Sequence, residues 1–177
     1  MLITIYILAG LLALVIILAA IGPKKYDVSR AIVIHKPVTE VFPYVKLVKN
    51  QDHWSPWKAK DPNMMQTYSG QDGTVGFKAS WKGNKQVGEG SQTISGIKEG
   101  ERIDTQMVFL KPFKSTSEAY YIFHPEDQDK TKIIWGIKGE NKFPVTIMMN
   151  FINMDKAVGK DFDEGLGNLK RILEQSS

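Results

Sequence analysis

The first hydrophobic pattern in the chain is an apolar run over residues 1–21, MLITIYILAGLLALVIILAAI, in which a threonine and a tyrosine are mildly polar. A helix of about 20 apolar residues is long enough to cross the roughly 30 Å hydrocarbon layer of a bilayer. The small residues Ala20 and Gly22 would also suit the cleavage site of a signal peptide. However, the run exceeds the usual signal core of about 7–15 residues, and no basic residue precedes it. We therefore predict a transmembrane anchor in residues 1–22.

After residue 28 the pattern changes to short runs of period 2, which is typical of β-strands. The first of these runs covers residues 29–35. Six more follow without a helical pattern between them, at residues 64–69, 74–82, 86–98, 102–111, 116–124 and 132–140. Turn residues separate these runs, and parallel neighbours would need crossovers of about a dozen residues or more. The sequence therefore predicts an antiparallel meander.

Two further segments follow the helical period. Residues 37–48 gather their valines and Phe42 on one face, although Pro43 should kink or shorten this helix. From Phe151 to Leu173, apolar or small residues recur at steps of three and four, which predicts one long C-terminal helix. Three glycines in this helix, each costing about 1 kcal/mol relative to alanine, either allow close approach to the sheet or are simply tolerated. They are Gly159, Gly165 and Gly167.

This order of elements predicts an α+β domain of two layers. A curved antiparallel sheet has one face to bury, and the C-terminal helix is the only predicted element long enough to cover it. Residues 50–58 (NQDHWSPWK) are rich in turn residues, with room for one short helical turn. We place a short basic linker in residues 23–27 and the folded domain in residues 28–175.

The composition narrows the classes of protein that fit this pattern. The 177 residues include 23 Lys and Arg, 19 Asp and Glu and no cysteine, for a formal net charge of +4. The length fits one globular domain after the apolar run, and the lack of cysteine excludes a disulfide scaffold and a thiol nucleophile. Basic residues are spread over every predicted element, so we expect no nucleic-acid binding. On a tethered domain this modest positive charge favours contact with anionic membrane lipid.

The charges that flank the apolar run indicate its orientation. No Lys or Arg precedes the run, whereas Lys24 and Lys25 follow it directly. Loops rich in Lys and Arg stay on the cytoplasmic side of a membrane. We therefore predict a single-pass membrane protein whose domain lies in the cytoplasm.

Several short stretches resemble one known superfamily. Residues 31–42 (AIVIHKPVTEVF) are similar to the opening segment of START-like proteins, also called the SRPBCC or Bet v 1-like superfamily. Residues 50–61 resemble the Trp-x-x-Trp stretch of its polyketide cyclase/dehydrase branch, and weaker likenesses continue in order, covering roughly residues 26–174. The resemblance implies a helix-grip fold, in which a seven-stranded curved antiparallel sheet wraps a long C-terminal helix. It also implies a cavity between them that usually holds an apolar or amphipathic small molecule.

Aromatic and methionine side chains are the candidates for lining such a cavity. Trp54 and Trp57 lie in a polar, turn-rich segment that regular strand packing does not explain. The other candidates lie on predicted strands or near the start of the last helix: Phe77, Trp81, Phe109, Tyr121, Trp135, Met148 and Met149. Each of these side chains suits an ordinary core position equally well.

Candidate catalytic groups are few. The three histidines lie far apart in the sequence without ligand spacing, so we expect no metal ion. The Gly-Glu-Gly at residues 88–90 lacks the third glycine and the helix of a dinucleotide loop, so we expect no cofactor. We interpret its glycines as a bulge or a point of close approach. Glu89 between them is either a general base or an outward-facing solvated residue, and Tyr121 is the second catalytic candidate.

These observations predict a membrane-anchored domain that binds a hydrophobic or amphipathic, lipid-like small molecule. Two alternatives stay open: a cyclase/dehydrase-like enzyme that uses Glu89 or Tyr121, and a protein-interaction module with a protein partner. An enzyme requires at least two polar groups that converge inside the cavity, whereas a carrier requires a nearly apolar one. An interaction module would have a filled cavity and an exposed apolar patch.

Overall fold

A computed structural model describes residues 2–175 of the chain. It contains one seven-stranded antiparallel sheet in the order β1-β7-β6-β5-β4-β3-β2. The strands are β1 (Lys25–Ile34), β2 (Met65–Ser69), β3 (Lys78–Lys82), β4 (Glu89–Lys98), β5 (Arg102–Lys111), β6 (Ser115–Asp127) and β7 (Lys130–Glu140). From β2 to β7 each strand pairs with the next in sequence, and β1 closes the edge beside β7, so the predicted meander is confirmed.

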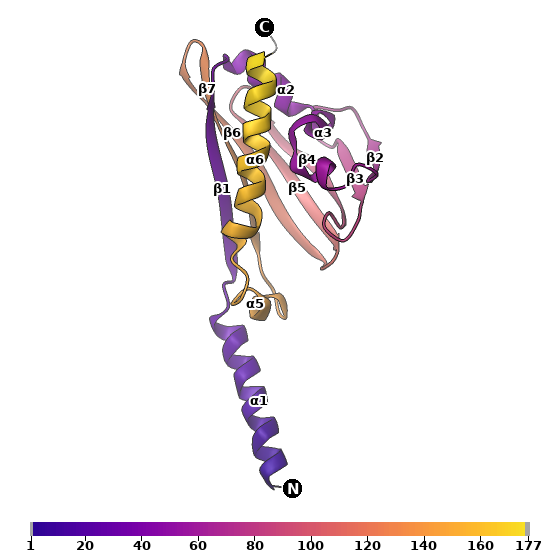
Figure 1. Cartoon of the computed structure of the whole chain (residues 1–177), viewed down its shortest axis with the longest axis vertical. Helices are drawn as coiled ribbons and strands as arrows, with labels where there is room; N and C mark the ends of the chain where they lie inside the picture. The colour runs from indigo at the N-terminus through magenta and orange to yellow at the C-terminus, as the bar shows by residue number, and fades with distance from the viewer. Residues whose placement is uncertain (1, 176–177) are drawn as a thin grey trace.

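The helices lie on one side of this sheet or beyond its end. They are α1 (Leu2–Ile21), α2 (Val38–Lys46), α3 (Gln51–Trp54), α4 (Pro56–Lys60), α5 (Val145–Met148) and α6 (Met154–Gln175), with one 3-10 turn at Val48–Asn50. In Figure 1, α6 crosses the face of the sheet and α1 projects away from the domain. This arrangement is the predicted α+β helix-grip architecture.

The structure differs from the sequence-based prediction at several element boundaries and in one additional helix. β1 begins at Lys25, so the second half of the predicted linker belongs to the sheet. β3 is shorter than predicted because Gly73 and Gly76 adopt φ angles of 77° and 92°, which a regular strand does not contain. The helix α5 was not predicted, since its 4 residues are too few to show a helical period.

Among residues 2–175, α1 is the one helix that is long and apolar enough to cross a membrane, judged by length and composition. Its mean hydropathy is 2.9, and none of its residues is buried against the rest of the chain. Its last turn meets the segment that contains α5 (Figure 1).

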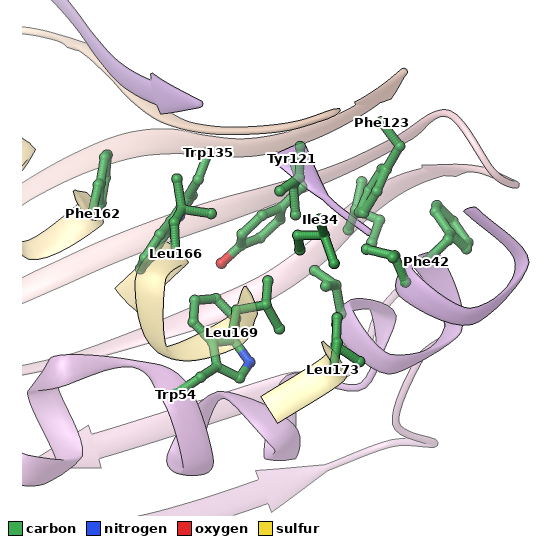
Figure 2. Packing of buried hydrophobic residues seen from close by; sticks show 14 of the residues in the cluster. Ile34, Phe42, Trp54, Tyr121, Phe123, Trp135, Phe162, Leu166, Leu169 and Leu173 are labelled. Carbon is green, nitrogen blue, oxygen red and sulfur yellow. The ribbon is translucent and has the colours of Figure 1, made fainter. Parts of the chain in front are cut away.

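The main hydrophobic core lies between the sheet and the second half of α6 (Figure 2). The large buried side chains of α6 recur at steps of three and four, which confirms the predicted amphipathic helix. They are Phe162, Leu166, Leu169 and Leu173. At the far end of this core, Phe42 of α2 meets Phe123 of β6 edge to face, with ring centroids 5.0 Å apart.

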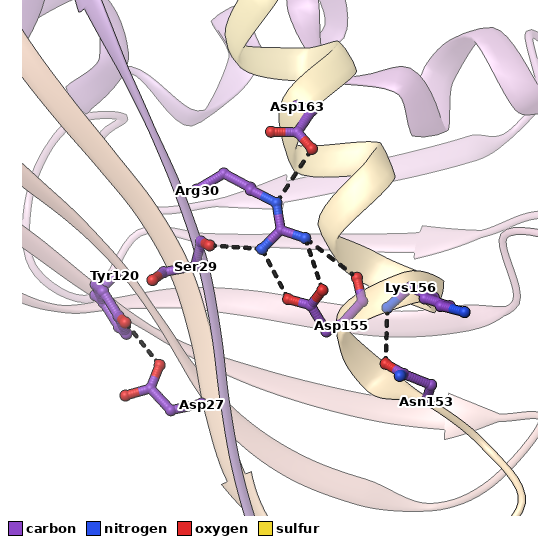
Figure 3. A network of polar contacts seen from close by, with 8 residues as sticks. All are labelled: Asp27, Ser29, Arg30, Tyr120, Asn153, Asp155, Lys156 and Asp163. Carbon is purple, nitrogen blue, oxygen red and sulfur yellow. Dashed lines mark hydrogen bonds and ion pairs between the residues drawn. The ribbon is translucent and has the colours of Figure 1, made fainter.

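Ion pairs fix the first half of α6 against β1 (Figure 3). The guanidinium of Arg30 donates hydrogen bonds to Asp155 at 2.8 Å and to Asp163 at 3.1 Å. Asn153 caps the helix by accepting a backbone N–H at 3.0 Å. Arg30 lies directly against Gly159, where any Cβ atom would overlap the guanidinium. Gly159 therefore permits a close approach between strand and helix.

The other two glycines of α6 have opposite surroundings. A Cβ atom on Gly165 would lie 2.7 Å from Cζ3 of Trp135, which is closer than van der Waals contact allows. The Trp135 ring has little room to move, because the rings of Phe162 and Trp54 pack on it with centroids at 4.2 Å and 5.0 Å. A Cβ atom on Gly167 would meet nothing within 4 Å. Close approach thus explains Gly165, and tolerance explains Gly167.

We predict opposite effects of alanine at these two glycines. Gly165→Ala should lower the free energy of unfolding by about 1–2 kcal/mol, because overpacking against Trp135 outweighs the gain in helix propensity. Gly167→Ala should raise it by up to about 1 kcal/mol, because only the gain in propensity remains. Urea unfolding of the full chain in detergent micelles, followed by tryptophan fluorescence, measures both. Equal effects of the two substitutions would contradict the proposed packing.

Candidate functional site

A cavity of about 1690 Å³ lies between the sheet and the first half of α6. Side chains of all seven strands line its sheet side, and Met154, Val158, Asp161 and Phe162 of α6 line the other. The second half of α6 contributes nothing to this cavity, because its leucines fill the space down to the sheet. The interior of the domain is therefore packed at one end and hollow at the other.

A cluster of aromatic rings separates the hollow end from the packed end. Trp135 lies at its centre and stacks on Phe162 at 4.2 Å and on Tyr121 at 5.7 Å between ring centroids. Trp57 and Trp54 contact the same indole edge to face, at 5.5 Å and 5.0 Å. Such contacts add stabilisation beyond area burial and hold the rings in fixed orientations. The cluster therefore forms a rigid inner wall of the cavity.

The structure brings six of the nine predicted lining residues together around the cavity. These six are Trp57, Trp81, Phe109, Tyr121, Trp135 and Met149. Trp54 is buried within the aromatic cluster and does not line the cavity (Figure 2), and Phe77 packs in a separate small cluster with Val48, Ala79 and Ile94. Met148 lies in α5, outside the cavity lining.

In the sheet wall, Trp81 packs closely against Gly90, its partner on the neighbouring strand. A Cβ atom on Gly90 would lie 2.7 Å from Cζ2 of Trp81, and the Trp81 ring meets that of Phe109 at 6.0 Å. The register of β4 against β5 shifts between Glu89 and Gly90, next to Gly88 with a φ of 72°. The interpretation of these glycines as a bulge and a point of close approach is confirmed.

Three polar side chains form a hydrogen-bonded chain on the inner wall. The side-chain amide of Gln92 donates to Gln51 Oε1 at 2.8 Å, and Gln51 Nε2 donates to the Tyr121 hydroxyl oxygen at 3.3 Å. Gln92 is positioned by β4, whereas Gln51 begins α3. Neither glutamine was predicted from the sequence. The one signal for Gln92 was its pairing across the sheet with inward-facing Met107, which is visible only once the register is known.

Tyr121 is held as a neutral phenol. Its side chain is buried, and this burial raises the pKa of the phenol well above its ordinary value. Since its oxygen accepts the hydrogen bond from Gln51, its own O–H remains free to donate to a bound molecule. Tyr121 is therefore suited to orient a ligand and unsuited to abstract a proton at neutral pH.

The carboxylates near the cavity are already engaged. Asp161 of α6 forms an ion pair of 2.6 Å with Lys60, and Asp52 accepts a hydrogen bond of 2.8 Å from Gln66. Glu89, the predicted general-base candidate, does not line the cavity. It pairs across the sheet with Lys82, on the face opposite to Trp81, and forms an ion pair of 3.0 Å with Lys111. Of the two catalytic candidates, the structure thus places only Tyr121 in the cavity wall.

In the described part of the chain, no group of three or more His, Asp or Glu side chains is arranged to hold a metal ion.

Comparison with known proteins identifies the fold. No protein-family model matches the chain, and no curated protein matches it in sequence. Solved structures do match. A structural-genomics protein from Thermobifida fusca, solved by NMR, aligns with a TM-score of 0.64 and 17% identity, over 84% of this chain and 93% of its own.

Two enzymes align equally well. Norcoclaurine synthase from Thalictrum flavum, solved in complex with dopamine and hydroxybenzaldehyde, has a TM-score of 0.65 and 10% identity, over 91% of this chain and 93% of its own. An aromatase/cyclase from a Streptomyces species has a TM-score of 0.62 and 10% identity, over 85% and 94%. The chain therefore has the Bet v 1-like, or START-like, helix-grip fold that aromatase/cyclases also use.

The buried phenol leads to a prediction about alkaline pH. In the unfolded chain Tyr121 ionises near its ordinary pKa of 10.0, whereas in the folded chain burial keeps it protonated. Raising the pH through about 10 therefore stabilises the unfolded state, and the free energy of unfolding falls. The Tyr121→Phe variant should lose less stability than the native chain between about pH 8 and pH 11. Urea unfolding at both pH values measures this, and equal losses would show that Tyr121 is solvated in the folded chain.

Proposed function

We propose that the chain binds a hydrophobic or amphipathic small molecule in the cavity between the sheet and α6. The observation that carries this proposal is the distribution of polarity over the cavity wall. Apolar atoms form most of the cavity surface, and aromatic and methionine side chains such as Trp57, Trp81, Phe109 and Met149 contribute to it. A ligand pocket is typically lined in this way, with a few placed polar groups that fix orientation.

The polar chain on the inner wall favours an amphipathic ligand. A hydroxyl or carbonyl oxygen of the ligand would accept a hydrogen bond from the free O–H of Tyr121. Gln51 and Gln92 would hold that phenol in place. The apolar body would then lie along Trp81 and Phe109. Norcoclaurine synthase, which has the same fold, holds two small aromatic compounds in its solved complex.

We further propose that α1 anchors this domain in a membrane. Its length and hydropathy support the anchor, and Lys24 and Lys25 on the domain side favour a cytoplasmic location. The bound molecule would then be lipid-like, since a domain held beside a bilayer meets apolar compounds chiefly there.

Two observations favour binding over the two alternatives: the protonation of the polar side chains in the cavity and the open volume of the cavity. Three polar groups converge on the cavity wall, as an enzyme would require, but none of them is a general base, because glutamines do not titrate and Tyr121 stays protonated at neutral pH. The lining carboxylates Asp52 and Asp161 are already engaged. A protein-interaction module would have its interior filled, whereas here about 1690 Å³ is open.

The proposal is tested by the molecules that co-purify with the full chain. Protein extracted from native membranes and gel-filtered in detergent should release one dominant apolar or amphipathic compound, detected by mass spectrometry of the organic extract. Phe109→Glu places a charge on the apolar wall and should reduce the recovered compound by about tenfold or more, since every 1.4 kcal/mol of lost affinity is tenfold.

A matched variant controls for damage to the fold. Ile122→Glu introduces the same charge on the neighbouring strand β6, at a half-buried position on the opposite face of the sheet from Tyr121. It should retain the compound at the native level. Native protein that is repeatedly empty, or equal losses in the two variants, would rule out binding at this cavity.

A further inference from the structure

Three large aromatic side chains are exposed at the end of the domain from which α1 emerges. Phe143 and Phe151, which flank α5, are 69% and 76% exposed, and Phe113 in the turn between β5 and β6 is 53% exposed. Phe113 and Phe143 also line the cavity, so they stand at its mouth. Monomeric proteins rarely expose such a group of apolar side chains to water without a binding purpose.

The segment that carries Phe143 and Phe151 is fixed to the last turn of α1 (Figure 1). The side-chain amide of Asn150 donates a hydrogen bond of 2.9 Å to the carbonyl of Leu18. The backbone of Gly22 lies so close to Thr146 that a Cβ atom would overlap its carbonyl oxygen. The segment is therefore attached to the end of the helix.

A second amide fixes the link that follows α1. The side chain of Asn141 donates to the carbonyl of Pro23 at 2.9 Å, and its backbone N–H donates to that of Lys24 at 2.8 Å. Residues 141–150 thus hold both the last turn of α1 and the connection to β1. Since an α-helix rises about 1.5 Å per residue, Leu18 lies only about 5 Å from the end of α1. If α1 spans a bilayer, this segment lies at the depth of the headgroups.

The charges around the exposed aromatic side chains suit the same environment. Lys24, Lys114 and Lys142 are exposed and form no ion pair with any residue in the described range 2–175. Glu140, the nearest carboxylate in sequence to this segment, is paired with Lys25 at 3.5 Å. Aromatic rings together with unpaired lysines are typical of the interface of a bilayer that contains anionic lipid.

We propose that residues 141–153 and the turn of Phe113 dock on the headgroup layer of the leaflet nearest to the domain, so that the mouth of the cavity opens onto lipid. This proposal takes the anchor from the proposed function, and it makes that leaflet the source of the ligand. A bilayer is the chosen partner because α1 is continuous with the surface and the unpaired charges are positive.

Because the chain contains no cysteine, single nitroxide labels test this docking in the full protein. The positions are Phe143→Cys and Phe151→Cys, with Val75→Cys as the matched control. Val75 is also an exposed apolar residue, at 61%, but it lies in the loop between β2 and β3. The protein is reconstituted in vesicles of phosphatidylcholine with about one third phosphatidylglycerol, an anionic lipid. Oxygen, which concentrates in lipid, and a water-soluble nickel complex then compete in relaxing each label.

Labels at positions 143 and 151 should respond more to oxygen than to the nickel complex, and the label at position 75 should show the reverse. Aqueous accessibility at 143 and 151 equal to that at 75 would overturn the proposal. Protection from nickel without a gain in oxygen response would also overturn it, because a protein partner or a second copy would then cover the surface. Empty protein with lipid-exposed labels refutes ligand binding alone, whereas recovered ligand with water-exposed labels refutes membrane docking alone.

Discussion

The packing of Trp135 on Phe162 and Tyr121, next to a helix position where a Cβ atom would overlap the indole, decides how the interior of this domain is divided. Gly165 lets α6 approach the indole closely, and four other rings then pack around it. Beyond this cluster the leucines of α6 close the space completely. Before it, α6 presents Met154, Val158 and the ion-paired Asp161, and the cavity opens. One aromatic cluster thus serves as the end of the core and the inner wall of the site.

A helix that leaves a cavity beneath its first half loses apolar packing there and must be held by other means. Arg30 of β1 holds this half of α6 in place, because its two partners, Asp155 and Asp163, lie on either side of Gly159 along the helix. Single exposed ion pairs contribute little stability, but a guanidinium shared by two carboxylates fixes direction as well as distance. The second half of α6 is therefore held on the sheet by apolar packing, and the first half by the ion pairs of Arg30. The ion pairs hold the first half in place above the cavity.

Hydrophobic periodicity predicted the order of the elements, the antiparallel meander and the covering helix, because each of these depends on which face of a segment is apolar. It could not locate the cavity, because core and lining residues share that face. Trp54 and Trp57 look equivalent in the sequence, yet they belong to two short helices that place one behind the wall and the other on it. Glu89 sits beside a bulge, where the alternation of faces is interrupted, and Gln51 becomes part of the site only through a contact 70 residues away.

The segment between β7 and α6 contacts both α1 and the cavity of the folded domain. The same short stretch holds the end of α1 through Asn150, and it contributes Phe143 and Met149 to the cavity. Aromatic side chains around the mouth of a cavity favour association with other apolar surfaces when they face water. The proposed contact with a bilayer would cover these side chains and would bring the cavity to the phase in which an apolar ligand dissolves. The position of the mouth next to α1 is thus a physical consequence of one segment that joins the helix to the domain.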